Sequence, residues 1–228
     1  MKKIVVLTGA GMSAESGIST FRDSGGLWEK HKIEDVATPE AWERNPQLVH
    51  QFYNERRKQL LKASPNEGHI GLVGLEKFFD VKIITQNVDN LHERAGSSWV
   101  LHLHGSLMQM RSTGPGREIY DVRPEKTEYF EGDLCPKGYP IRPHIVWFGE
   151  EVPNIPFAIE IVRDADILVI IGSSLKVYPA AGLLNYAGKG IPVYLIDPNE
   201  VDVDKNRVQF ICKGASEGVT ELKKLLGV

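Results

Sequence analysis

Short, continuous apolar runs are the most regular pattern along this chain. Five of them are rich in valine and isoleucine and lack an alternating polar face, which is typical of strands buried on both sides of a parallel sheet. They lie at residues 3–9, 81–87, 99–105, 166–174 and 191–198. A weaker run at residues 207–214 is a sixth candidate strand.

Helical patterns separate most of these apolar runs. Residues 66–79 precede the second run, and residues 179–190 follow the fourth, with Gly190 as a stop signal. Residues 216–228 form an amphipathic pattern for which Ser216 is the expected N-cap. Strands that alternate with helices predict an α/β fold with a doubly wound, mostly parallel sheet of the Rossmann-like type.

Two stretches depart from this alternation. Residues 23–65 have helical patterns but no core strand, and residues 106–145 are rich in glycine, proline and charge. We expect both to form a smaller lobe inserted into a single domain that spans residues 1–228. The large Rossmann-like lobe then consists of residues 1–22, 66–105 and 146–228.

Composition narrows the class of protein without naming a function. The chain has 228 residues, 42% of them hydrophobic, and its net charge of −3 gives no reason to expect nucleic acid as a partner. No apolar run approaches the roughly 20 residues of a membrane span, and the N-terminal run is a first strand rather than a signal peptide. Two distant cysteines, Cys135 and Cys212, argue against a disulfide framework and favour a reducing, cytoplasmic location.

Small residues follow two of the predicted strands. The sequence GAGMSA at 9–14 matches the glycine pattern that lets a backbone approach a pyrophosphate at a helix N-terminus, and GSS at 172–174 ends another strand. Together these turns predict a phosphate site at the carboxyl edge of the sheet. The acidic residue expected at the end of a second strand is missing, which disfavours a hydride-transferring dehydrogenase.

Polar residues end the second and third strands. Asn87 and Asp89 are two residues apart and point the same way if the strand extends that far, although from these residues alone a polar loop with Asx turns is the favoured explanation. His102 and His104 alternate with leucines, and His104 stands just before a glycine, where a general base is well placed. Metal binding by the two histidines lacks an obvious third ligand.

The motifs assembled so far occur together with two further segments. They are GAGMSAESGISTFR (9–22), TQNVDNLHERAG (85–96), LHGS (103–106), VWFGE (146–150), GSS (172–174) and YPAAGLLN (178–185). In order and spacing the chain resembles the sirtuin family of NAD-dependent protein-lysine deacylases over nearly its whole length. Residues 24–42 and FYNERRKQL at 52–60 resemble the bacterial members of the desuccinylase and demalonylase branch, class III.

The resemblance implies roles for matching positions. His104 is then the general base, and Asn87 and Asp89 are catalytic residues of the nicotinamide pocket. With these three, the resemblance assigns the following residues to NAD: Gly9, Ala10, Gly11, Ser13, Phe21, Arg22, Gln86, Gly172, Ser173, Ser174, Asp197 and Cys212. It assigns the substrate peptide to a strand that pairs with it by β-augmentation, made by Val146, Phe148, Gly149 and Glu150.

The pair Tyr53 and Arg56 has two readings. Residues three apart share a helix face, and a solvated basic helix surface is the ordinary explanation. The resemblance instead places the pair in the acyl pocket, where a hydroxyl and a guanidinium fork suit the carboxylate of succinyl or malonyl groups while some deacetylation persists. Ala14 is then a small residue beside the acyl chain, and Arg57 is expected on the outside of the helix.

A structural zinc site held by two Cys-x-x-Cys pairs is common in the resembled family. Here the four positions are occupied by Ser112, Pro115, Cys135 and Gly138. One thiolate is too few, because a structural zinc normally takes four Cys or His ligands. We therefore expect no zinc and a small core built from these aromatic residues instead: Tyr120, Tyr129, Phe130 and Tyr139.

The implied reaction uses NAD and an acylated lysine of a protein and yields nicotinamide, O-acyl-ADP-ribose and free lysine. We expect a monomer without nucleic-acid or membrane partners. Two alternatives remain open. A mono-ADP-ribosyltransferase would cleave the same cofactor but needs no acyl pocket, and a non-catalytic NAD-binding module would not need His104, Asn87 and Asp89 together.

Overall fold

A six-stranded parallel sheet forms the larger part of the computed structural model, which describes residues 1–18 and 31–228. The strands stand in the order β3-β2-β1-β7-β8-β9, and each neighbouring pair is parallel. Their bounds are β1 Lys3–Thr8, β2 Asp80–Thr85, β3 Val100–His102, β7 Ile167–Ile171, β8 Val193–Ile196 and β9 Gln209–Ile211. All six predicted strands are confirmed, as is the doubly wound α/β class.

The order of the strands reverses between β1 and β7. From β1 the chain first builds the sheet outward through β2 and β3, and later returns to the other side of β1 with β7. Ligands of open α/β sheets bind at the carboxyl ends of the strands beside such a reversal. The two turns after β1 and β7 therefore mark the edge at which a site is expected.

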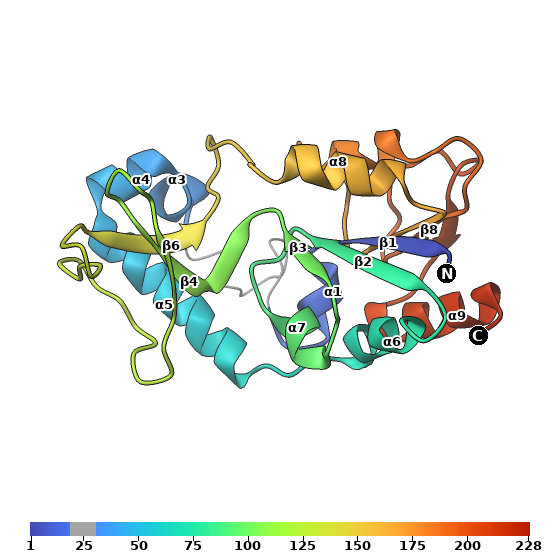
Figure 1. The fold of residues 1–228 in the computed structure, drawn as a ribbon, viewed down its shortest axis with the longest axis horizontal. Helices are drawn as coiled ribbons and strands as arrows, with labels where there is room; N and C mark the ends of the chain where they lie inside the picture. Colours follow the sequence, from blue (N-terminus) through green and yellow to red (C-terminus); the bar gives the residue numbers. More distant parts are fainter. Residues whose placement is uncertain (19–30) are drawn as a thin grey trace.

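Helices cover both faces of this sheet. Helix α8 (Ile155–Arg163) and the 3-10 helix η1 (Ala180–Tyr186) lie on one face, and α6 (Glu67–Leu75) and α9 (Ala215–Leu226) lie on the other (Figure 1). Successive β1 residues alternate between the two apolar cores, because strand side chains point alternately to opposite faces. Both faces of the central strands are thus buried, which explains why these strands show no polar alternation in the sequence.

Two local predictions about the helices need correction, and one helix was missed. The segment after β7 is a 3-10 helix rather than an α-helix, and α9 has Gly214 as its N-cap. Ser216 lies within the first turn, where its hydroxyl donates to the carboxylate of Glu15 instead of capping the helix. Helix α8 was not predicted at all, although its pattern is strongly amphipathic.

In the part of the chain that the structure describes, three helices and a second sheet form what is here called the small lobe. The helices are α3 (Ile33–Val36), α4 (Pro39–Arg44) and α5 (Pro46–Lys62), and the antiparallel sheet has the order β5-β4-β6. Its strands are β4 Gly105–Ser112, β5 Ile119–Asp121 and β6 Ile141–Ile145. The small lobe lies beside the carboxyl edge of the large sheet in Figure 1. These strands were missed because they are embedded in glycine-, proline- and charge-rich sequence.

The core of the small sheet differs from the predicted aromatic cluster. Tyr129 is buried and Tyr120 packs against the same core, but Phe130 is 56% exposed and Tyr139 is 42% exposed. A turn in which Phe130 N donates to Asp133 Oδ2 leads the chain away from the core at this point. The core is completed by four other residues: Met110, Val122, Cys135 and Ile141.

None of the helices in the described part of the chain is long and apolar enough to cross a membrane.

Candidate functional site

The two small-residue turns lie against each other at the reversal point of the sheet. Gly11 N donates to Gly172 O at 3.0 Å, and Gly9 N donates to Ile171 O at 3.0 Å. A Cβ atom at Gly9 would lie 2.7 Å from Gly172 O, and one at Gly11 would lie 2.7 Å from Gly172 Cα. Glycine is therefore required at both positions by the close approach of the two turns.

Ser13 links the first turn to the loop after β2. This serine is buried in the short helix α1 (Gly11–Ala14), whose N-cap is Ala10. Its hydroxyl donates to Asp89 Oδ2 at 2.9 Å and accepts from Asn87 Nδ2 at 3.1 Å. The structure thus brings three predicted residues from two distant segments into one hydrogen-bonded group.

Asp89 is held at both carboxylate oxygens. Besides the bond from Ser13, Leu91 N donates to Asp89 Oδ1 at 3.1 Å. Burial raises the pKa of Asp89, and these two hydrogen bonds act in the opposite direction. A desolvated carboxylate with fixed donors is suited to bind an amide, because its oxygens are already oriented.

His104 follows β3 and contacts the main chain of the loop after β2. Its Nδ1 lies 3.0 Å from Gln86 O. A carbonyl oxygen only accepts, so Nδ1 carries the hydrogen of the neutral ring and Nε2 carries the lone pair. Burial lowers the pKa of His104, which keeps the ring neutral and able to take a proton at Nε2.

Gln86 connects the loop after β2 with the turn after β7. Its Nε2 donates to Ser173 Oγ at 3.2 Å, and Leu175 N donates to the same oxygen at 3.3 Å. Ser174 follows in the same turn and is half-buried. Polar groups from three strand ends, β1, β2 and β7, therefore meet at one edge of the sheet.

Residues assigned to the adenine end lie further along this edge. Asp197 follows β8 and accepts from Asn199 N at 2.9 Å, whereas Cys212 follows β9 and is exposed. The two strands end side by side, since Ile196 pairs with Ile211. Two other predicted cofactor residues, Phe21 and Arg22, lie outside the described residues.

Tyr53 and Arg56 lie on α5 next to the loop that carries Asp89. Tyr53 is buried, and its hydroxyl accepts from Trp147 Nε1 at 3.0 Å. Arg56 is half-buried, with its guanidinium carbon 5.8 Å from the ring centre of Tyr53. Burial lowers the pKa of Arg56, while the charges of Tyr53 and Asp89 act to raise it. The pair thus lies within electrostatic range of Asp89, and Ala14 is exposed at the end of α1.

Arg57 was expected on the outside of α5, and that expectation is wrong. The side chain is 1% exposed, with Nε donating to Leu107 O at 2.7 Å and Nη1 donating to Thr127 O at 2.9 Å. Burial lowers the pKa of Arg57 to about 10. Consecutive helix residues are turned by about 100° from each other, so Arg57 faces β4 while Arg56 faces the loop after β2. Nothing in the sequence signals this burial, because a buried arginine in a basic run looks like a solvated one.

The segment 146–150 does not form the predicted peptide-binding strand. Strand β6 ends at Ile145, and Glu150 N donates to Trp147 O at 3.0 Å to close a turn in which Gly149 has a φ of 91°. The main chain of the segment is anchored at two points, Val146 N to His104 O and Phe148 N to Ala37 O, both at 3.0 Å. The turn competes with extension, since the main-chain N–H groups of Val146, Phe148 and Glu150 already donate within the protein.

The carboxylate of Glu150 accepts hydrogen bonds from donors within the protein itself. Arg142 donates to it from Nη1 at 2.8 Å and from Nη2 at 3.1 Å, and Trp147 N donates at 2.8 Å. Burial raises the pKa of Glu150, but the bonds from Arg142 and Trp147 outweigh this and lower it. Arg142 and Trp147 were missed by the sequence analysis, although both orient this segment.

The described residues, 1–18 and 31–228, contain no group of three or more His, Cys, Asp or Glu side chains placed to hold a metal ion. Cys135 Sγ lies 3.4 Å from Ser112 Oγ, within the apolar core of the small sheet. The four positions that would carry zinc thus offer a single thiol, and they do not fit a zinc site.

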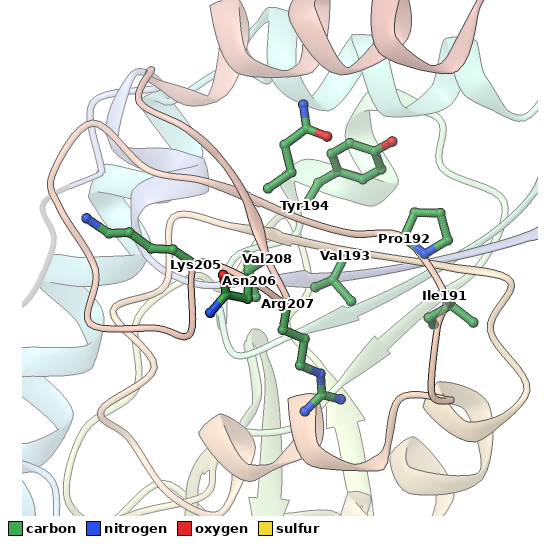
Figure 2. Close-up of a pocket in the computed structure, with 9 residues that line it drawn as sticks. Ile191, Pro192, Val193, Tyr194, Lys205, Asn206, Arg207 and Val208 are labelled. Atoms are coloured by element: carbon green, nitrogen blue, oxygen red, sulfur yellow. The ribbon is translucent and has the colours of Figure 1, made fainter.

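A cavity of about 360 Å³ lies at the opposite edge of the large sheet. It is lined by residues 191–194, at the start of β8, and by residues 205–209. Figure 2 shows Tyr194 and Arg207 pointing to opposite sides of the strands, and Arg207 Nη2 donates to Leu184 O at 3.0 Å. The polar side chains do not converge, and none of the predicted site residues lies there.

Comparison with known proteins gives consistent matches along the whole chain. The sequence pattern of the Sir2 family matches residues 9–179. An "NAD-dependent protein deacylase" of Bacteroides thetaiotaomicron is 60% identical over 99% of this chain and 98% of its own length.

Solved structures agree with this match. A Sir2 homologue in complex with NAD superposes with a TM-score of 0.87 at 37% identity, over 99% of this chain and 91% of that one. A Sir2 protein solved with a deacetylated p53 peptide and 3'-O-acetyl ADP-ribose has a TM-score of 0.85 at 31% identity, over 99% of this chain and 94% of that one.

Proposed function

Because this chain belongs to the Sir2 (sirtuin) family, we propose that it is an NAD-dependent protein-lysine deacylase that removes succinyl, malonyl and also acetyl groups. The observation that carries the proposal is the hydrogen-bonded group of Ser13, Asn87 and Asp89. It stands at the reversal point of the sheet, beside the glycine turns and next to a histidine whose Nε2 is ready to accept a proton.

The residues at the carboxyl edge fit NAD by the chemistry of their groups. The small-residue turns at residues 9–11 and 172–174 let phosphates approach the main chain at the start of α1, and the Gln86 and Ser173 side chains offer hydrogen bonds to ribose hydroxyls. Ser13, Asn87 and Asp89 together bind the carboxamide of the nicotinamide, Phe21 and Arg22 cover the cofactor, and Asp197 and Cys212 flank its adenine end. NAD, when bound, supplies the ribose carbon that receives the acyl oxygen as nicotinamide leaves.

His104 performs the proton transfer in this proposal. The bond from Nδ1 to Gln86 O fixes the ring, and Nε2 takes a proton from a ribose hydroxyl. The lowered pKa of His104 keeps Nε2 unprotonated near neutral pH. Asn87 and Asp89 position the leaving group, so the base and the binding group are supplied by different strand ends.

Tyr53 and Arg56 select acidic acyl groups in this proposal. A guanidinium binds a carboxylate through two parallel hydrogen bonds, and a half-buried site strengthens them by excluding water. Asp89 lies close enough to act on the charge of Arg56, so the acyl end and the nicotinamide end of the site are near each other. A neutral acetyl group gains nothing from the guanidinium, and it is therefore the slower substrate.

The substrate is an acylated lysine in a peptide, bound along Val146, Phe148, Gly149 and Glu150. Support comes from the exposure of Phe148 and from the open space around the Cα atom of Gly149, which let another backbone approach. Since the Glu150 carboxylate is already bound by Arg142, we propose that the peptide is recognised through backbone groups.

The other expectations from the sequence stand as proposals. We propose a protein without bound zinc, because the residues at the four ligand positions offer one thiol. A single catalytic domain with the two lobes given above, a monomeric state and a cytoplasmic location complete the proposal, the last resting on the two free cysteines.

One assay separates this function from its alternatives. Purified protein is incubated with NAD and acetyl-, succinyl- or malonyl-lysine peptides. Free lysine, O-acyl-ADP-ribose and ADP-ribosylated protein are then measured. We expect free lysine with all three peptides, fastest with the acidic ones. ADP-ribosylated protein without free lysine would instead indicate a mono-ADP-ribosyltransferase. NAD binding without turnover would indicate a non-catalytic binding module.

A further inference from the structure

His102 lies two residues before the general base and takes no part in the reaction as described. Its ring bridges two groups on different segments. Nδ1 lies 3.1 Å from Asn87 O, and Nε2 lies 2.7 Å from Glu93 Oε1 on α7 (Leu91–Ala95). The histidine therefore connects the loop that carries Asn87 to the helix that follows it.

Both partners of this ring only accept hydrogen bonds. A main-chain carbonyl and a carboxylate offer lone pairs and no hydrogen, so both contacts are satisfied only when both ring nitrogens carry hydrogen. A neutral ring would turn one lone pair toward an acceptor. The geometry thus requires the imidazolium form, with Glu93 as its counter-ion.

Other titratable groups near His102 come from each neighbouring element. Asp89 lies in the loop after β2, His92 lies on α7, and His144 lies on β6. Burial lowers the pKa of His102, but the hydrogen bond and charge of Glu93 outweigh it, with smaller contributions from Asn87 O and Asp89, and the pKa is raised. The pKa values of His92 and His144 are lowered by burial, so both are neutral neighbours when His102 is charged.

Asn87 is held at three of its atoms. Its N donates to Thr85 Oγ1 at 3.0 Å, its Nδ2 donates to Ser13 Oγ at 3.1 Å, and its O accepts from His102. The first two bonds come from buried residues beneath the loop, whereas His102 lies at the rim on edge strand β3. With the main chain fixed on both sides, the carboxamide of Asn87 has one orientation.

We propose that His102 and Glu93 form a positioning pair that fixes the main-chain carbonyl of Asn87 and thereby orients its carboxamide for nicotinamide. This inference rests on the proposed NAD-dependent function. The pair is not a structural anchor, because the Glu93 side chain is 43% exposed and water can replace its contact. Its loss therefore weakens cofactor binding while the fold remains.

The test compares three variants with the wild type, using calorimetry for the dissociation constant of NAD and a melting curve for the fold. His102→Leu removes both contacts and raises the dissociation constant about tenfold at pH 7, with an unchanged melting temperature. His102→Asn restores part of the affinity, because its amide nitrogen stands where Nδ1 stood. Glu160→Gln removes a carboxylate from an exposed pair with Arg163 on α8, and it leaves the affinity unchanged.

Glu93→Gln sharpens the test, since a carboxamide both donates and accepts. In the wild type the affinity for NAD falls as pH rises through the raised pKa of His102, because the neutral ring satisfies only one acceptor. In Glu93→Gln a neutral ring donates from Nδ1 to Asn87 O and accepts at Nε2 from the amide. The alkaline loss of affinity therefore disappears in this variant.

Several outcomes overturn the positioning pair. The first is wild-type affinity for NAD in His102→Leu. The second is a loss of affinity in His102→Leu that comes with a lower melting temperature and that His102→Asn does not relieve. The third is a loss of NAD affinity at alkaline pH that persists in Glu93→Gln. An NMR titration adds a readout without cofactor, in which a His102 ring that titrates below 6.5 also refutes it. If the wild type releases no lysine while the variants still differ in NAD affinity, the proposed function fails and the pair stands.

Discussion

Helix α5 lies between two regions of the molecule, and each region surrounds one of two consecutive arginines in a different way. Toward the loop after β2 it presents Tyr53 and Arg56, and toward the small sheet it presents Asn54 and Arg57. Arg56 is half-buried between aromatic rings and within range of Asp89. Arg57 is fully buried, and its donors are directed at main-chain carbonyls.

The small-lobe side of α5 is a closed network. Asn54 accepts from Tyr129 N at 3.1 Å and donates to Tyr129 O at 2.8 Å, and Arg57 Nη1 donates to Asn54 Oδ1 at 3.0 Å. A ligand cannot enter such a network without breaking bonds that are already made. Two arginines one position apart therefore lie in different surroundings: Arg57 belongs to this closed network, and Arg56 is the one proposed to bind the substrate.

The largest expected effect comes from removing the proposed general base. We expect His104→Ala to lower lysine release by roughly 10²- to 10⁴-fold, which is the usual contribution of a general base. The rate is measured with a succinyl-lysine peptide, and NAD affinity and melting temperature serve as controls that stay near wild type. Near-normal turnover would exclude His104 as the base.

The substitution Arg57→Met tests whether the side of α5 that faces the small lobe is structural. Removing the guanidinium leaves buried carbonyls without donors, so we expect the free energy of unfolding to fall by about 3 kcal/mol. Urea denaturation measures the loss. The ratio of desuccinylation to deacetylation should not change, and a changed ratio with wild-type stability would reverse the roles assigned to the two arginines.

The matched substitution one position earlier, Arg56→Met, should do the opposite. Desuccinylation should fall by roughly 10- to 100-fold relative to deacetylation, because the bound carboxylate loses a charge-assisted, two-pronged partner. The measurement is kcat/KM for both peptides under the same conditions, with urea denaturation alongside. An equal loss of both activities would assign Arg56 to the structural side with Arg57.

The pH dependence of turnover gives a smaller but independent effect. Burial lowers the pKa of His104, and the base must be unprotonated to act. At saturating NAD, activity should therefore fall only when the pH drops below the usual histidine value of about 6.5. The profile of kcat/KM against pH measures this, and an acid limb centred above that value would contradict the buried position of the ring.

For treatment with a metal chelator we expect no effect on stability or activity. The small lobe is proposed to be stabilised by the Asn54–Arg57 network and the apolar core around Cys135 rather than by zinc. Prolonged dialysis against a chelator should leave both the melting temperature and the lysine release unchanged. Stoichiometric zinc in the purified protein, or a chelator-dependent loss of stability, would refute this account of the small lobe.

Much of the site could be predicted because its residues stand directly after strands. Gly9, Asn87, His104 and Gly172 follow four apolar runs, and parallel strands place their carboxyl ends at one edge. The structure brings these residues together as expected, while their roles stay predictions until they are tested. Segment 146–150 could not be predicted in this way, because whether it turns or extends depends on contacts with Ala37 and Arg142.

The sequence by itself determined the strands of the large sheet and the glycine turns, since short-range apolar runs and turn residues define both. Its motifs, taken together, also carried the resemblance to the family. Only the tertiary structure decided which polar side chains are buried and what they contact. Arg57 finds its acceptors 50 and 70 residues away, and His102 bridges two segments that are adjacent only in the fold. The physical reason is that burial depends on partners brought by the rest of the chain, whereas an apolar run or a glycine turn carries its own signal.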